Sequence, residues 1–133
     1  MAGYGRRRSS RAAAVTSIGV DHVRLSYDYL DAGNLDAYGS LLDDDVQVRR
    51  PDAGQGRGRV QVQQLHAEVT GPPGRHLLDQ IIADGDSIVV TGRFVRPPAP
   101  TGTQLDVEFV DVFTLSDFGL LLGYRRYYYV APN

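Results

Sequence analysis

The stretch QLDVEFVDVFTL, residues 104–115, constrains the fold strongly because its side chains alternate with a period of two. One face of a strand here carries Leu105, Val107, Phe109, Asp111, Phe113 and Leu115. This alternation predicts a strand whose apolar row faces the core. Asp111 would then lie inside, where a carboxylate must be paired or stay protonated. The opposite register would bury Asp106 and Glu108, so it makes the poorer core.

The last apolar stretch, LLLGYRRYYYV over residues 120–130, supplies candidate partners for Asp111. The more apolar face of a strand here carries Leu120, Leu122, Tyr124, Arg126, Tyr128 and Val130. We therefore expect Arg126 to enter the same cavity as Asp111. It either forms a buried salt bridge with Asp111 or neutralises an anionic ligand or an oxyanion.

The first half of the chain has a different periodicity. Residues 16–32 carry apolar side chains at positions 20, 23, 27 and 30, which is typical of one helix face. Further elements are expected as helices over 35–42 and 59–69, a short strand over 43–50, and a hairpin within 76–95 around ADGD. Helices followed by antiparallel strands predict an α+β fold, with a curved sheet wrapped around the first helix and a pocket on its concave side.

The totals limit the classes of function. The 133 residues suffice for one domain, which we place at 16–133 after a disordered basic tail over 1–15. No apolar run approaches the ~18 residues needed to cross a bilayer, and the tail lacks the apolar core of a signal peptide. We therefore expect a cytoplasmic protein without a membrane partner. A net charge of −2 argues against a nucleic-acid partner, although YRRYYY interleaves arginine with aromatics.

Metal and cofactor chemistry have little support in the sequence. The chain has no cysteine, and its three histidines do not show a His-x-x-x-His spacing. The glycine-rich stretch over 52–58 lacks the Lys-Ser/Thr ending of a phosphate loop and is expected to be a loop. We predict neither a metal site nor a cofactor.

Other candidate residues leave alternatives open. His66 lies on the apolar stripe of the third helix, either as a satisfied core residue or as part of a hydrogen-bond network. Tyr27 either packs in the core or extends its hydroxyl into the pocket. Arg50 or its neighbour Arg49 faces the pocket, because a one-residue slip exchanges the two.

The element order and the stretch YDYLDAGNLDAYGSLLDDDVQVRRP, residues 27–51, resemble the NTF2-like superfamily, which includes ketosteroid isomerases and SnoaL-like polyketide cyclases. The resemblance covers roughly residues 18–130. It implies a cone-shaped fold, in which a curved antiparallel or mixed sheet wraps around N-terminal helices as a cystatin-like α+β barrel. These signatures specify the fold better than the activity.

The resemblance to ketosteroid isomerase assigns individual positions. Asp111 falls on the oxyanion-hole aspartate, and His66 falls on a tyrosine of the active-site network. Ser26 stands where the oxyanion-hole tyrosine is expected, with Tyr27 beside it. Arg50 replaces the general-base aspartate, which argues against steroid isomerisation by the same mechanism. Pocket-lining positions of the family fall on Tyr124, Arg126 and Tyr128.

Two other relatives suggest different chemistry. Limonene epoxide hydrolase uses an Asp-Arg-Asp set, but here Phe109 stands for the arginine and Arg126 for the second aspartate. The SnoaL-like cyclases use a single acid/base carboxylate on an activated substrate, which fits one inward Asp111 better.

The resemblance therefore implies a small cofactor-independent enzyme of secondary metabolism. It would isomerise, cyclise or dehydrate a polyketide-like compound by proton transfer, with Asp111, His66 and Arg126 as catalytic residues. Substrate contacts are expected from Tyr27, Arg50, Phe109, Tyr124 and Tyr128. The alternative is a non-catalytic module of the same fold that binds an anionic or aromatic small molecule.

The same resemblance implies a homodimer. Members of this superfamily often associate through the convex face of the sheet. Tyr127, Tyr129 and Val112 are expected on that outward face here.

Overall fold

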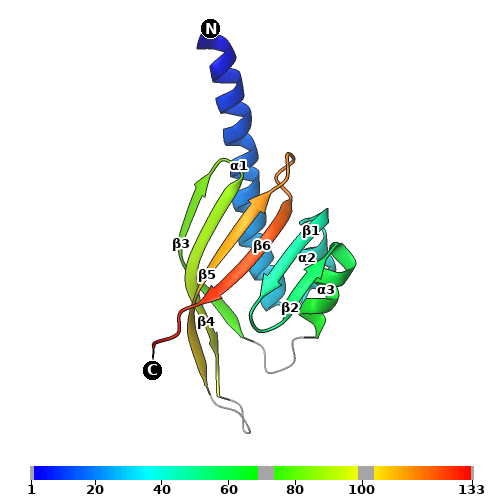
Figure 1. Ribbon diagram of the computed structural model, residues 1–133, viewed down its shortest axis with the longest axis vertical. Helices are drawn as coiled ribbons and strands as arrows, with labels where there is room; N and C mark the ends of the chain where they lie inside the picture. The colour runs from blue at the N-terminus through cyan, green and yellow to red at the C-terminus, as the bar shows by residue number, and fades with distance from the viewer. Residues whose placement is uncertain (1, 69–73, 99–103, 133) are drawn as a thin grey trace.

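Helix α1, Ala2–Asp31, is the element around which the sheet curves. The computed structural model describes residues 2–68, 74–98 and 104–132, with side chains from residue 11 onward. The C-terminal half of α1 lies against the concave face, whereas its first turns project beyond the sheet (Figure 1). Residues 2–15, for which we expected a disordered tail, are thus part of this helix.

The helix buries one narrow stripe. Val23, Ser26 and Tyr27 are buried, at the i, i+3 and i+4 spacing of one helix face. Asn34 then caps the short helix α2, Leu35–Gly39, by accepting a hydrogen bond from the Ala37 amide at 3.2 Å.

Strand β1, Leu42–Arg50, pairs with a strand that we did not expect, β2, Gly54–Arg57. Our expectation of a loop over residues 52–58 was therefore wrong for this edge strand. Two glycines of this stretch are required by the backbone, because Gly54 and Gly58 have φ angles of +83° and +82°, which favour glycine. The third, Gly56, is buried beside the side chain of Val62. Val62 belongs to helix α3, Arg59–Ala67, which packs on β1 and β2.

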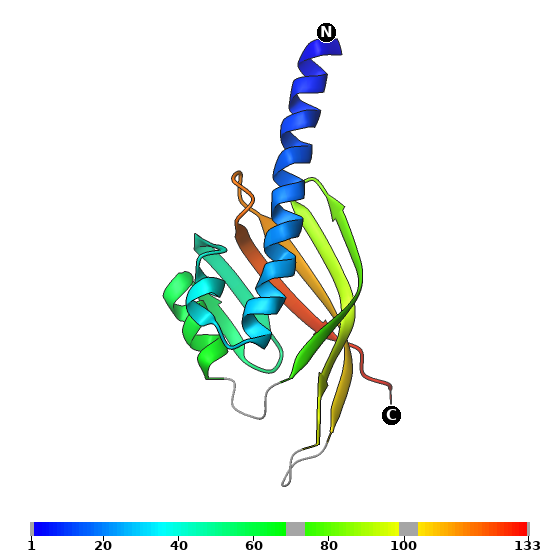
Figure 2. The same cartoon turned by 180° about the vertical axis from the view of Figure 1, so that it is seen from behind.

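The long strands complete one mixed sheet. They are β3 (Arg75–Asp84), β4 (Ser87–Arg96), β5 (Leu105–Leu115) and β6 (Leu121–Tyr128). The six strands have the order β2-β1-β6-β5-β4-β3, with β1 and β6 parallel and every other pair antiparallel. Figure 2 shows the sheet curving around α1, with α2 and α3 beside β1 and β2.

The alternation over residues 104–115 is confirmed. Phe109, Asp111, Phe113 and Leu115 are buried, whereas Glu108 faces solvent. The predicted inner face of the last strand is correct from Tyr124 to Tyr128.

The two ends of that last strand differ from our expectation. Leu121 is buried instead of its neighbours Leu120 and Leu122, and Val130 is exposed. The register shift between Thr114 and Leu115 explains the first difference, because an extra residue exchanges the faces. None of the helices in the described part of the chain is long and apolar enough to cross a membrane.

Gly92 on β4 provides a test of the packing. A Cβ there would lie 2.4 Å from the backbone carbonyl oxygen of Leu77 and 3.0 Å from the ring of Phe109. We expect Gly92→Ala to lower the free energy of unfolding by ~1–3 kcal/mol, because a backbone atom cannot move aside cheaply. Gly123→Ala is the matched control, since its nearest neighbour would be at 3.4 Å. Urea unfolding measures both, and equal stabilities for the two variants would contradict this packing.

Candidate active site

The buried carboxylate of Asp111 is held by three donors. Arg126 Nε donates to Oδ1 at 2.8 Å, and Arg126 Nη2 donates to Oδ2 at 2.9 Å. The Tyr27 hydroxyl donates to Oδ2 at 2.6 Å. Of the alternatives for this side chain, the structure therefore has the buried salt bridge, with both partners inaccessible to water.

Arg126 lies between aromatic rings as well as against Asp111. Its guanidinium carbon is 4.3 Å from the ring centroid of Phe109 and 5.9 Å from that of Tyr124. Burial acts to lower the pKa of Arg126, but Tyr124 and the hydrogen bonds that Arg126 donates to Asp111 raise it above its ordinary value. Arg126 therefore stays positively charged in the interior.

A second carboxylate, Asp52, lies beyond Arg126. Arg50 donates to both of its oxygens at 2.9 Å, from Nε and Nη2. The Tyr128 hydroxyl donates to Asp52 Oδ2 at 3.0 Å and lies 3.5 Å from Arg126 Nη1. One chain of contacts thus runs from Asp111 through Arg126 and Tyr128 to Asp52. The open question about the arginines is also answered, because Arg50 points inward and Arg49 is exposed.

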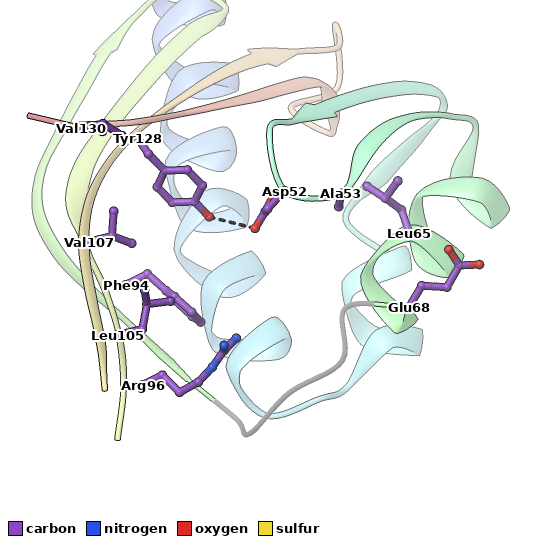
Figure 3. A pocket seen from close by; sticks show the side chains of 10 residues that line it. All are labelled: Asp52, Ala53, Leu65, Glu68, Phe94, Arg96, Leu105, Val107, Tyr128 and Val130. Carbon is purple, nitrogen blue, oxygen red and sulfur yellow. Dashed lines mark hydrogen bonds between the residues drawn. The ribbon is translucent and has the colours of Figure 1, made fainter. Parts of the chain in front are cut away.

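A cavity of about 660 Å³ opens beside this chain of contacts (Figure 3). Its apolar lining comprises Ala53, Leu65, Phe94, Leu105, Val107 and Val130. Its polar lining comprises Asp52, Glu68, Arg96 and Tyr128. Figure 3 shows the Tyr128–Asp52 hydrogen bond on one side and the Arg96 side chain across the space from it.

The charge of Asp52 is set by its neighbours. Partial burial acts to raise the pKa of Asp52, but the hydrogen bonds and charge of Arg50 outweigh burial, so the pKa lies below its ordinary value. Asp52 is therefore an ionised carboxylate at neutral pH, with its side chain 40% exposed. It is the acidic group next to Tyr128 in this cavity, whereas Asp111 is sealed behind Arg126.

The predicted site residues fall into two groups. One cluster brings together Asp111, Arg126, Tyr27, Tyr128, Arg50, Phe109 and Tyr124. Of these residues, Tyr128 lines the cavity. His66 instead contacts Tyr38, with Nε2 at 3.1 Å from the Tyr38 hydroxyl. Ser26 is buried and donates to the backbone oxygen of Val23.

Sequence reasoning missed Asp52 and Arg96. Asp52 follows Pro51 in the turn after β1, where strand alternation no longer indicates direction. Arg96 is the last residue of β4. Its buried Nε has no hydrogen-bond partner among the described residues, and its guanidinium carbon is 5.6 Å from the ring centroid of Phe94.

A third feature that we missed is the pair of His76 and Asp31. His76 Nδ1 lies 2.5 Å from Asp31 Oδ1, and its backbone amide donates to Oδ2 at 2.9 Å. This pair ties the end of α1 to β3. Burial lowers the pKa of His76 although the hydrogen bond with Asp31 opposes the shift.

The comparisons with known proteins agree with this architecture. The family model described as SnoaL-like domain matches residues 23–122, so the chain belongs to the SnoaL-like domain family. Among curated proteins, no relative matches the chain.

Solved structures show the same fold. A Jannaschia sp. protein, provisionally named a SnoaL-like polyketide cyclase, is 21% identical with a TM-score of 0.75, covering 86% of this chain and 87% of its own. TerC, co-crystallised with polyporic acid, is 19% identical with a TM-score of 0.73, and the match covers 84% of this chain and 91% of TerC. An LEH-like epoxide hydrolase from M. tuberculosis is 19% identical with a TM-score of 0.72, and the match covers 85% of this chain and 84% of the hydrolase.

The buried ion pair makes a prediction about stability. Asp111→Asn leaves the Arg126 charge buried without its counter-charge, so we expect the free energy of unfolding to fall by roughly 3–5 kcal/mol. Tyr27→Phe, which removes one donor and keeps the ion pair, should cost ~1–2 kcal/mol. Urea unfolding measures both. The double variant Asp111→Asn with Arg126→Met should lose much less than the sum of its single changes, and additive losses would contradict the coupling.

His66 predicts a pH dependence of stability. Burial, assisted by the charges of Arg50 and Arg126, lowers the pKa of His66 from 6.5 to about 3. Because the unfolded chain binds this proton first, stability should fall as the pH drops below 6.5, by up to ~1.4 kcal/mol per pH unit. We expect His66→Gln to reduce the difference between the unfolding free energies measured at pH 7 and at pH 5. Tyr38→Phe is the control: it retains the imidazole, so its unfolding free energy should depend on pH as steeply as that of the wild type. An equal pH dependence for the wild type and His66→Gln would contradict the lowered pKa of His66.

Proposed function

We propose that the protein is a small enzyme that transfers a proton on an apolar, carbonyl-bearing compound. The observation that carries the proposal is the pair of Asp52 and Tyr128, hydrogen-bonded at 3.0 Å on the wall of a cavity with mostly apolar side chains. A carboxylate beside a hydroxyl donor is the set needed to remove a proton next to a carbonyl and to stabilise the enolate.

The roles follow from the contacts. Asp52 accepts the proton of a C–H bond, whose electron pair moves into the enolate. On substrate binding, the Tyr128 hydroxyl, supported by Arg50 at 3.3 Å and Arg126 at 3.5 Å, turns its single proton from Asp52 Oδ2 to the enolate oxygen. Because the pKa of Asp52 is lowered, it is a weak base. It suits substrates whose carbon acid lies between two carbonyls, as in polyketides.

Asp111, which the sequence predicted as a catalytic residue, has a positioning role in this proposal. Its carboxylate has no exposed surface, so it acts as a positioning residue that holds Arg126 and Tyr27. His66 on α3 serves as a neutral hydrogen-bond partner of Tyr38 on α2. Arg96, across the cavity, binds a carbonyl or anionic end of the substrate.

Three reactions start from the same enolate: isomerisation, cyclisation and dehydration. Membership of the SnoaL-like family supports a polyketide-like substrate in secondary metabolism. A fold relative co-crystallised with polyporic acid is consistent with a cavity of this kind.

The second candidate is a binding module without catalysis. It is favoured by Arg50, which already occupies both oxygens of Asp52 and weakens it as a base. Binding of a ligand that is never altered would support this alternative.

A deuterium-exchange experiment tests the proposed chemistry. The probes are aromatic β-diketones, beginning with benzoylacetone, and NMR follows the loss of the proton between the two carbonyls in D₂O. We expect the protein to accelerate the exchange, and Asp52→Asn to remove ~10²–10⁴-fold of the acceleration. Tyr128→Phe should remove ~10–10²-fold, because one donor to the developing charge is lost.

Glu68→Gln is the matched control, because Glu68 is a carboxylate of the same cavity. Its rate should remain within about threefold of the wild-type rate, since acid–base catalysis requires a positioned group. Binding of a probe in the cavity can be seen as chemical-shift changes of the lining residues. If bound probes exchange their protons only at the rate in solution, the enzyme proposal is wrong and the binding-module alternative is supported.

A further inference from the structure

The parallel pairing of β1 with β6 aligns two Arg-Arg sequences side by side. Arg49 is the register partner of Arg125, and Arg50 and Arg126 come next on their strands. Because strand side chains alternate, the second pair points inward and the first pair points to the convex face. Figure 1 shows the two strands side by side, with β2 beyond β1 at the edge of the sheet.

The inner and outer pairs differ in their charge balance. Arg50 and Arg126 each bind a carboxylate within the protein. Arg49 and Arg125 are exposed, and in the described residues neither has a carboxylate within salt-bridge distance. Like charges directly opposite each other on a sheet are destabilising. The convex face therefore carries an uncompensated charge pair.

The neighbours of this pair offer no acid in the same row. Gln55 on β2 is the register partner of Arg49, and Val112 on β5 is the partner of Arg125. The next acidic residue along β1 on this side is Asp45, four residues from Arg49 and roughly 13 Å away along the strand.

A hollow of about 510 Å³ lies over these residues. Arg49, Arg125, Gln55 and Tyr127 line it. Tyr127 is 52% exposed, so its ring is free to stack on a ligand. This hollow shares Tyr128 and Val130 with the candidate active-site cavity, but Arg96 lines only the cavity and the arginine pairs line only the hollow.

We propose that this hollow is a second ligand site, which binds a small doubly charged oxyanion of the phosphomonoester class. The two outward guanidiniums match a phosphate group, since each offers a fork of N–H donors. The Gln55 amide adds a donor, and the Tyr127 ring contacts an aromatic part of the ligand. The site adjoins the cavity through Tyr128 and Val130, but its four proposed ligand contacts, Arg49, Arg125, Gln55 and Tyr127, do not line the cavity.

Calorimetric titration of the full chain with phenyl phosphate at an ionic strength of about 0.1 M tests the proposal. We expect saturable binding that weakens about tenfold or more in Arg49→Gln/Arg125→Gln, as expected for the loss of charged hydrogen bonds. Benzoate, with a single charge, should bind more weakly to the wild type than phenyl phosphate. Arg49→Lys/Arg125→Lys, which keeps the charges without the forks, should bind with intermediate affinity.

The matched control is Arg24→Gln/Arg75→Gln, which removes two exposed charges from α1 and β3. It should bind phenyl phosphate within about twofold of the wild type, since distant surface charges are screened. Equal losses in the two glutamine pairs, or no saturable binding by the wild type, would overturn the proposal. A changed sedimentation coefficient of Arg49→Gln/Arg125→Gln with unchanged phenyl phosphate binding would overturn it too, in favour of a contact between copies of the chain.

Discussion

The interior of this protein depends on the pairing of Asp111 with Arg126. A carboxylate and a guanidinium are both out of reach of water, and each is tolerated only because the other neutralises it. Register pairing of Asp111 with Arg126 across β5 and β6 places them opposite each other, and Tyr27 from α1 completes the set. Helix and sheet are therefore joined by polar contacts at the centre of an otherwise apolar core.

A chain of contacts between charged and polar side chains leads from this ion pair to the cavity. Arg126 contacts Tyr128, Tyr128 contacts Asp52, and Asp52 is held by Arg50. Each cation has an anion or a hydroxyl beside it, so the polarity reaches the cavity wall without an isolated buried charge. Asp52 and Tyr128 at the cavity wall are thus held by Arg50 and Arg126, which do not line the cavity.

Much of the fold could be predicted from periodicity, and the site only in part. Alternation along residues 104–115 placed Asp111 inside, because one face of that strand is decisively more apolar. The alternation predicted the wrong inward residues at the start of β6, because a register shift exchanges the faces there. It also did not predict β2, because that strand is rich in glycine and has no alternating apolar side chains. Asp52 could not be found in this way, since its direction is set by the turn after Pro51 and by contacts with Arg50 and Tyr128. The pair of Asp31 and His76 joins elements far apart in the sequence, which local patterns do not reveal.

The parallel contact between β1 and β6 has a consequence for the order in which the molecule assembles. β1 ends at Arg50, but its neighbour in the sheet begins only at Leu121, so most of the chain must be synthesised before the two meet. Contacts of such wide sequence separation slow folding, because a long loop must close before they form. On the ribosome, β1 therefore gains β6 as its neighbour only after the final strand has emerged, and that strand brings Arg126 and Tyr128 with it. Tyr128 can thus meet Asp52 only when the sheet is complete.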